Sequence, residues 1–257
     1  MGRAGWFGIL VALSIFSPGT GQESPELRDG GVVRGGRAAR QIALEFTGHE
    51  FGEGGEEILR QLASHKARGS FFLTGDFLRN PAFGPLVRRM VAEGHYVGPH
   101  SDRHLLYCAW EPGRKTLVSR DEFIRDLEGN LLELEKFGVR RSGMRYWVPA
   151  YEWYNQEIVR WSSEVGLQLV NFTPGTRSNA DYTGEADQGF VSSDEILRSI
   201  LACERTGTDG LNGFLLLMHV GAGAGRKDKM HDRLGELLDV LGSKGYLFIR
   251  IDELLRW

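Results

Sequence analysis

The sequence predicts an α/β fold, a distorted (β/α) barrel with about seven parallel strands. Short apolar runs alternate with segments of helical periodicity along almost the whole chain. Such alternation favours parallel strands joined by crossover helices, and about seven such units favour a closed or nearly closed barrel. A doubly wound sheet is the alternative, but no G-x-G-x-x-G motif follows the first strand to support dinucleotide binding.

Each expected strand is a short apolar run, and a helical pattern follows it. The expected strands are residues 41–46, 70–74, 95–98, 144–148, 167–172, 214–220 and 246–251. The expected helices are residues 55–66, 81–93, 121–137, 156–165, 193–203 and 229–244, with a short last helix from Asp252. The clearest helix carries Phe123, Leu127 and Leu131 at helical spacing and stops at Gly138.

The start of the chain has the pattern of a targeting segment. Arg3 precedes an apolar run from Trp6 to Phe16, which is too short to span a bilayer. We interpret residues 1–22 as a signal peptide and the Gly- and Arg-rich residues 23–40 as a flexible lead-in, followed by a barrel over 41–257. The protein is therefore expected to be exported, periplasmic or extracellular, with no membrane span after removal of the signal.

Composition narrows the function classes. The 257 residues are 41% hydrophobic and 25% charged, which is ordinary for a globular protein. The net charge of −3 is spread along the chain without a basic stripe, so nucleic acid is not an expected partner. Cys108 and Cys203 are far apart in sequence, and both a disulfide and two free thiols remain open. The oligomeric state is not indicated.

Polar residues follow several of the expected strands, and in a barrel these strand ends meet at one mouth. His100 and His104 are the densest such pair, four residues apart after the third strand. Further polar clusters follow the first strand, at 47–50, and the sixth, at 219–221. Imidazole is a common ligand of zinc and related ions, so the pattern predicts a metal site at the mouth.

The stretches Gly69–Gly75 and Gly94–His104 resemble the polysaccharide deacetylase superfamily, the carbohydrate esterases related to chitooligosaccharide deacetylase. The resemblance covers the chain from about residue 40 to the end. His100, Ser101 and His104 fall on the family's metal-binding H-[ST]-x-x-H motif. The resemblance implies a distorted (β/α) barrel and one bound divalent metal ion. Zinc is the default for a His-rich site, and cobalt or nickel could also fit.

The first family motif, T-F-D-D-G, is altered in this chain. Without a gap its two Asp positions fall on Thr47 and Gly48, and neither can act as base or ligand. With a short shift, His49 and Glu50 take the place of the pair. The resemblance then implies His49 as the third metal ligand and Glu50 as the base, with the reverse assignment left open.

The later family motifs supply the other expected site residues. The R-P-P-Y motif reads Val148–Tyr151 here, which implies that the Tyr151 backbone N–H binds the oxyanion. The motif's Arg is missing together with the Asp it pairs with, and a buried guanidinium alone would be costly. Glu152 is another base candidate. His219 matches the general acid of the L-x-H motif, and Asp181 matches the Asp that tunes it.

The implied function is a metal-dependent hydrolase that removes acetyl groups from a polysaccharide or oligosaccharide. Four aromatic residues near the mouth could stack on a sugar or pack the barrel rim: Trp147, Tyr151, Trp153 and Tyr154. Two alternatives stay open. One is a carbohydrate-binding relative without turnover, because the Asp pair and the Arg are absent. The other is a metal-dependent hydrolase of other C–N bonds.

Overall fold

The structure, a computed structural model, describes residues 24–256. The strands are β1 Glu26–Arg28, β2 Gly31–Arg34, β3 Gln41–Gly48, β4 Ser70–Leu73, β5 Tyr96–Pro99, β6 Tyr146–Trp147, β7 Gln168–Leu169, β8 Phe214–His219 and β9 Leu247–Ile249. The helices are α1 Gly55–Ser64, α2 Gly75–Arg79, α3 Gly84–Ala92, α4 Arg120–Glu135, α5 Gln156–Glu164, α6 Ser193–Thr206, α7 Leu234–Ser243 and α8 Ile251–Leu254. The expected signal peptide lies outside the described residues.

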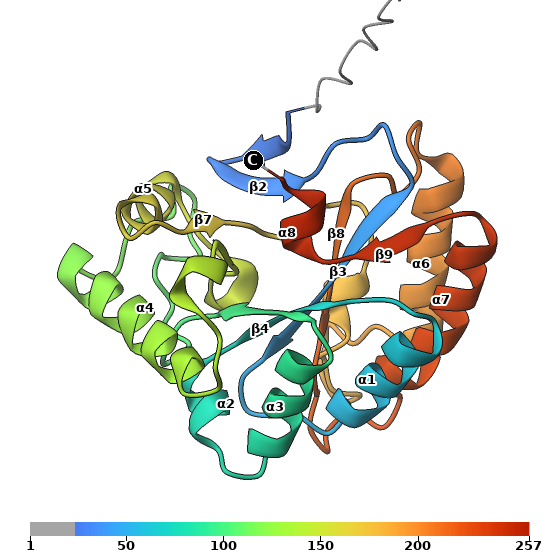
Figure 1. Cartoon of the computed structure of the whole chain (residues 1–257). Helices are drawn as coiled ribbons and strands as arrows, with labels where there is room; N and C mark the ends of the chain where they lie inside the picture. Colours follow the sequence, from blue (N-terminus) through green and yellow to red (C-terminus); the bar gives the residue numbers. More distant parts are fainter. Residues whose placement is uncertain (1–23, 257) are drawn as a thin grey trace, which may run out of the picture.

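The strands form a curled sheet around the central strand β3 (Figure 1). In the described part of the chain the larger sheet has the order β1-β2-β8-β3-β4-β5, and β9 also pairs with β3. β3 runs parallel to β4, β8 and β9, whereas β2 is antiparallel to β8. The α/β class is therefore confirmed, but strand orientation is mixed, and the all-parallel barrel is only partly present.

Single contacts join the small sheet β6–β7 to β5 and to β2 of the larger one. The Val148 N–H donates to the Pro99 carbonyl at 3.3 Å, which ties the end of β6 to β5. Val32 in β2 forms an isolated bridge with Val170 after β7. The ring of strands is thus nearly closed, with these isolated contacts in place of two full ladders.

The residues expected to form a flexible lead-in instead contain the β1–β2 hairpin. Asp29 and Gly30 both have positive φ, 48° and 87°, as a two-residue type I′ turn requires. Val32 and Val33 after the turn are buried, so this segment is part of the barrel wall. The predicted flexible lead-in is therefore wrong for this segment. Its short apolar strand β2 pairs with β8 and buries its valines in the wall.

Alternating side chains of β3 divide the interior into two cores. Ile42, Leu44 and Phe46 belong to the large cluster between the strands and the surrounding helices. Ala43 belongs to the smaller cluster inside the barrel. Because side chains along a strand alternate between its faces, Glu45 and Thr47 point inward with Ala43, toward the mouth.

Several helices begin as their sequences indicate. Ser119 caps α4, and Glu122 completes the capping box. Ser192 caps α6 through the Glu195 N–H. No helix among residues 24–256 is long and apolar enough to cross a bilayer. Cys108 and Cys203 are both free thiols, so the disulfide alternative is not present in this structure.

Candidate active site at the carboxyl ends of the strands

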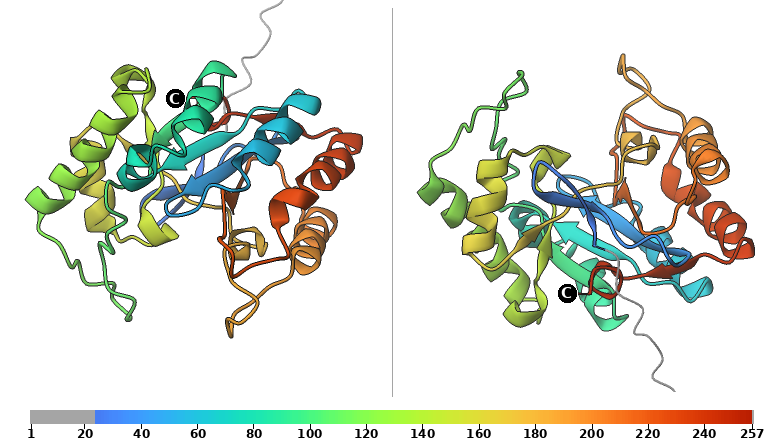
Figure 2. Two further views of the ribbon diagram at one scale, coloured as in Figure 1. Left: turned by 90° about the horizontal axis from the view of Figure 1, so that it is seen from below. Right: turned by 90° about the horizontal axis from the view of Figure 1, so that it is seen from above.

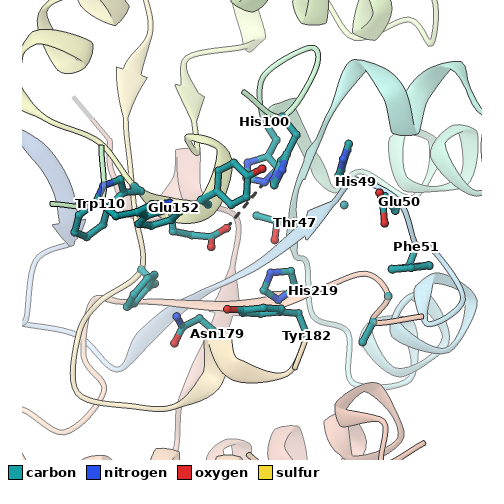
Figure 3. Close-up of a pocket in the computed structure, with 17 residues that line it drawn as sticks. Thr47, His49, Glu50, Phe51, His100, Trp110, Glu152, Asn179, Tyr182 and His219 are labelled. Carbon is teal, nitrogen blue, oxygen red and sulfur yellow. Dashed lines mark ion pairs between the residues drawn. The ribbon is translucent and has the colours of Figure 1, made fainter. Parts of the chain in front are cut away.

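A cavity of about 450 Å³ opens at the carboxyl ends of the parallel strands. Its walls come from the last residues of β3 and β8 and from the loops after β3, β5, β6, β7 and β8 (Figure 3). Two loops extend beyond the barrel, one between β5 and α4 and one between β7 and α6 (Figure 2). The structure therefore brings the predicted polar clusters to one mouth, since the strands that precede them are adjacent or nearly so.

His100 is held firmly at the end of β5. Its backbone N–H donates to Oδ1 of the fully buried Asn130 at 2.8 Å. Its ring Nδ1 lies 2.8 Å from the Val148 carbonyl, which can only accept, so Nδ1 carries the hydrogen. Burial, offset in part by that hydrogen bond, lowers the pKa of His100 to about 3. The ring is thus neutral at pH 7, and its Nε2 lone pair is free.

His104 and His49 lie face to face in the same cavity. Their ring centroids are 4.3 Å apart with planes 11° from parallel. His104 also lies beside His100, with centroids 5.2 Å apart. Burial and the neighbouring His100 lower the pKa of His104 to about 2, so this ring is also neutral. His49 Nδ1 lies 3.2 Å from the Thr74 hydroxyl oxygen.

This stacking bears on the predicted metal triad. A metal bound through a ring nitrogen lies in the plane of that ring, and two nearly parallel planes do not meet nearby. His49 and His104 therefore cannot both bind one ion in the observed arrangement. Among residues 24–256, no three His, Cys, Asp or Glu side chains are arranged to hold a metal ion as they stand.

Glu152 reaches the cavity through an unusual backbone turn. Tyr151 and Glu152, within the 3₁₀ segment Ala150–Glu152, have φ of 61° and 51°. The Glu152 carbonyl accepts from the Asn171 side chain at 2.7 Å, which fixes the turn. Its carboxylate Oε1 lies 4.0 Å from His100 Nε2 (Figure 3). Burial raises the pKa of Glu152 to about 7, with His219 opposing the shift and Asp181 adding to it.

His219 and Asp181 form a hydrogen-bonded pair on the opposite side of the cavity. His219 Nδ1 lies 2.7 Å from Asp181 Oδ1, and the His219 backbone N–H donates to Oδ2 at 2.9 Å. Burial alone would lower the pKa of His219, but the charge of Asp181 and its hydrogen bond outweigh burial and raise it. The predicted neighbours are thus in contact, and Nε2 is the ring atom left to face a ligand.

Two inward side chains of β3 have unpaired polar atoms beneath the cavity. Within residues 24–256, both carboxyl oxygens of the fully buried Glu45 have no hydrogen-bond partner. The Thr47 hydroxyl, at one of the family's Asp positions, is likewise buried and without a partner. Burial, with the nearby Glu152, raises the pKa of Glu45 to about 8, so its carboxyl group is mostly neutral at pH 7.

Aromatic side chains form the rim, in part different from those expected. Tyr151 and Trp153 line the cavity, together with Trp110 from the loop after β5 and Tyr182 beside His219. Trp147 is instead fully buried in the large core. Tyr154 is also buried, and its hydroxyl donates to the Arg28 carbonyl. These two side chains support the wall and cannot stack on a ligand at the mouth.

Glu50, the expected base, also lines the cavity but lies at its exposed edge. It makes no ion pair or side-chain hydrogen bond within residues 24–256. The buried carboxylate of the site is Glu152, which the sequence marked only as a second candidate. Trp110 was missed altogether, because it lies in a loop outside every family motif.

The fold and the site define an α/β protein with a curled, mixed sheet, whose pocket gathers histidines and carboxylates at the strand ends. The family model for polysaccharide deacetylase matches residues 37–170. The chain belongs to the polysaccharide deacetylase family.

Named relatives agree with this assignment. The chitooligosaccharide deacetylase of Sinorhizobium fredii is 25% identical over 229 residues, covering 84% of this chain and 92% of that protein. A peptidoglycan-N-acetylglucosamine deacetylase of Bacillus cereus is 23% identical over 218 residues, covering 84% of this chain and 68% of that protein. A CE4 family pseudoenzyme from Bacillus anthracis has the same fold, with a TM-score of 0.67 and 19% identity over 89% of this chain and 69% of that one.

Proposed function

We propose that the protein is an exported hydrolase that removes acetyl groups from a polysaccharide or oligosaccharide. The observation that carries this proposal is the pairing of His219 with Asp181 in the same cavity as His100 and Glu152. One side of the cavity can exchange a proton, and the other holds neutral imidazoles beside a carboxylate. The aromatic rim suits the apolar face of a sugar ring.

His219 is the proposed general acid. Its Nδ1 is held by Asp181, so a proton on Nε2 can be given to the leaving amine or alcohol. The Asp181 carboxylate stabilises the protonated ring, which raises the pKa of His219 against the effect of burial. Glu50 is the proposed base. The Tyr151 backbone N–H, beside the cavity, is the proposed donor to the oxyanion.

A divalent metal ion is part of the proposal, and the donor set fits one. His100 keeps a free Nε2 lone pair because its Nδ1 donates to a carbonyl, which is how metal-binding imidazoles are usually oriented. In the part of the chain that the structure describes, the buried Thr47 hydroxyl has no hydrogen-bond partner, and Thr47 lines the same cavity. His100 and His104 would hold the ion, which when bound would activate water and polarise the acyl oxygen. Zinc is proposed, with cobalt or nickel as substitutes.

A second function has one observation in its favour. Thr47 and Gly48 stand where the family has its two Asp residues, so the last two positions of β3 contribute no carboxylate to the cavity. A carbohydrate-binding relative without turnover would also have this composition.

A measurement of acetate release distinguishes the proposed hydrolase from a carbohydrate-binding protein. The full chain, supplied with zinc, cobalt or nickel, is incubated with acetylated chitooligosaccharides, peptidoglycan and acetylxylan. Release that His219→Ala abolishes supports the hydrolase. Glycan binding by titration calorimetry, with no acetate from any substrate, supports the binding protein instead.

A further inference from the structure

We propose that Glu152 supplies the carboxylate ligand of a divalent metal site that His100 and His104 complete. The inference rests on the proposed function, because it names the third ligand of that site. It assigns to the segment after β6 a role that the sequence placed at the end of β3.

Glu152 is the carboxylate best placed beside these imidazoles. In β3, Thr47 and Gly48 end the strand, and Glu45 lies deeper, fully buried among the inward side chains. Glu50, in the loop that follows β3, lies at the exposed edge of the cavity. His49 stacks parallel to His104 at 4.3 Å, so these two rings cannot share an ion as they stand. Glu152, which follows β6, is nearly buried and lies beside His100.

His100 and Glu152 are close to the spacing of two ligands on one ion. Zinc lies about 2.0–2.2 Å from nitrogen and oxygen ligands, so two ligand atoms on a tetrahedral zinc are about 3.4 Å apart. His100 Nε2 and Glu152 Oε1 are separated by 4.0 Å. A small rotation of the Glu152 side chain would bring the two atoms to the spacing that a shared ion requires.

The His100–His104 pair is equally compatible. Two imidazoles bound through nitrogen to one tetrahedral zinc have ring centres about 5 Å apart, given the usual zinc–nitrogen distance. The observed centroids are 5.2 Å apart, with planes inclined by 59°. The inclined planes can intersect at a shared ion, unlike those of His49 and His104. Rotation of the His104 ring out of its stack with His49 would complete the site.

The environment of Glu152 suits a metal ligand. Its side chain is only 10% exposed, and among the described residues its one ion-pair contact is with the His100 ring. A buried carboxylate is costly unless it is paired or binds a metal ion. The positive φ angles of Tyr151 and Glu152 add backbone strain. Such strain is often found at sites that position a functional side chain. Two histidines and one carboxylate are also a donor set that catalytic zinc sites use.

The test is cobalt and zinc binding by the full chain, measured by calorimetry and by the visible absorption of bound cobalt. Glu152→Gln keeps the side-chain volume and removes the charge. We expect it to weaken binding at least roughly 100-fold, since loss even of a ligand's outer partner costs 10–100-fold. His49→Ala is expected to change the affinity less than Glu152→Gln does. Glu111→Gln, on the exposed loop after β5, is the matched control and is expected to keep wild-type affinity.

Three results overturn the inference: wild-type protein that binds neither metal, Glu152→Gln with unchanged affinity, or His49→Ala with the larger loss. Should Glu152→Gln not fold, by circular dichroism, Glu152→Asp keeps the charge with a shorter reach. Unchanged affinity in that variant also counts against the proposal. Metal bound through Glu152 without acetate release contradicts the proposed function alone. Acetate release with metal affinity independent of Glu152 contradicts the inference alone.

Discussion

The carboxylate of Asp181 holds His219 twice, through ring Nδ1 at 2.7 Å and through the backbone N–H at 2.9 Å. Asp181 follows the short 3₁₀ segment Ser178–Ala180, and His219 ends β8. One side chain therefore sets both the position of the histidine backbone and the direction of its ring. Because Nδ1 is engaged, any proton exchanged with a ligand must move through Nε2.

Asp181→Asn should lower the pKa of His219. Burial, which lowers that pKa, persists in the variant, while the charge and hydrogen bond that raise it are removed or weakened. We expect the histidine titration followed by NMR to move to lower pH and turnover to fall by roughly 10²–10⁴-fold. Asp121→Asn, on the exposed first turn of α4, is the control. An unchanged His219 titration would contradict the assignment.

The same pair makes a pH-dependent contribution to stability. The folded-state pKa of His219 is raised, so its contribution is fully present below the unfolded value of about 6.5. It is lost as pH rises through the folded-state pKa. Urea unfolding of wild type and Asp181→Asn should therefore differ more at pH 5.5 than at pH 9. Equal differences at both pH values would show that the pair is not ionised as inferred.

Asn130→Ala should destabilise the fold through the segment that carries His100. The Asn130 side chain accepts from the His100 N–H at 2.8 Å and donates to the Leu73 carbonyl at 3.0 Å. Truncation leaves both buried backbone groups unpaired, at about 1–3 kcal/mol each. Urea unfolding measures the loss. Leu132→Ala, at an exposed position of the same helix, should change the stability little. A loss of stability there as large as that of Asn130→Ala would contradict the explanation by lost hydrogen bonds.

The sequence predicted the parallel strands because each is a short apolar run between helical patterns. It did not predict the β1–β2 hairpin, although Asp29-Gly30 is a strong turn signal beside Val32 and Val33. The surrounding glycines and arginines obscured it. The burial of Trp147 was also not predictable, because position near a strand end does not say which face of the strand a side chain occupies.

For the site, the histidine spacing and the family resemblance were enough to bring His100, His104, His219 and Asp181 together. The orientation of Glu152 could not be foreseen, since it depends on two successive left-handed residues that are not glycine. Sequence patterns predict such conformations only where glycine or asparagine marks them. The stacking of His49 on His104 likewise depends on side-chain packing, which no motif records.

Trp110→Ala should weaken substrate binding more than turnover, if the rim binds a glycan. Trp110 is 53% exposed and packs edge-on against Tyr151, with centroids 5.7 Å apart. It also lies beside Trp153 at 5.3 Å. Loss of one aromatic contact should raise KM or Kd by roughly 2- to 10-fold, with kcat retained. Leu117→Ala, equally exposed in the same loop but outside the cavity, is the control. A fall in kcat alone would contradict a binding role.

Glu45→Gln should remove much of the pH dependence of folding stability. Burial raises the folded-state pKa of Glu45 from 4.5 to about 8, so the native state keeps a proton that the unfolded chain has lost. The contribution of Glu45 to the free energy of unfolding is therefore largest below pH 4.5, and it decreases as the pH rises toward 8. The shift corresponds to on the order of 4–5 kcal/mol at 1.36 kcal/mol per pKa unit. Gln is the neutral isostere and should stay folded.

Urea unfolding at pH 5 and pH 8.5 tests this. The free energy of unfolding of the wild type should fall by several kcal/mol from pH 5 to pH 8.5. That of Glu45→Gln should fall much less, so that the variant is the more stable protein at pH 8.5. Glu111→Gln should follow wild type, because its carboxylate is exposed. If Glu45→Gln and wild type lose stability in parallel, the carboxyl group is ionised in the folded protein. The inward face of β3 must then contain a cation or water that stabilises the charge.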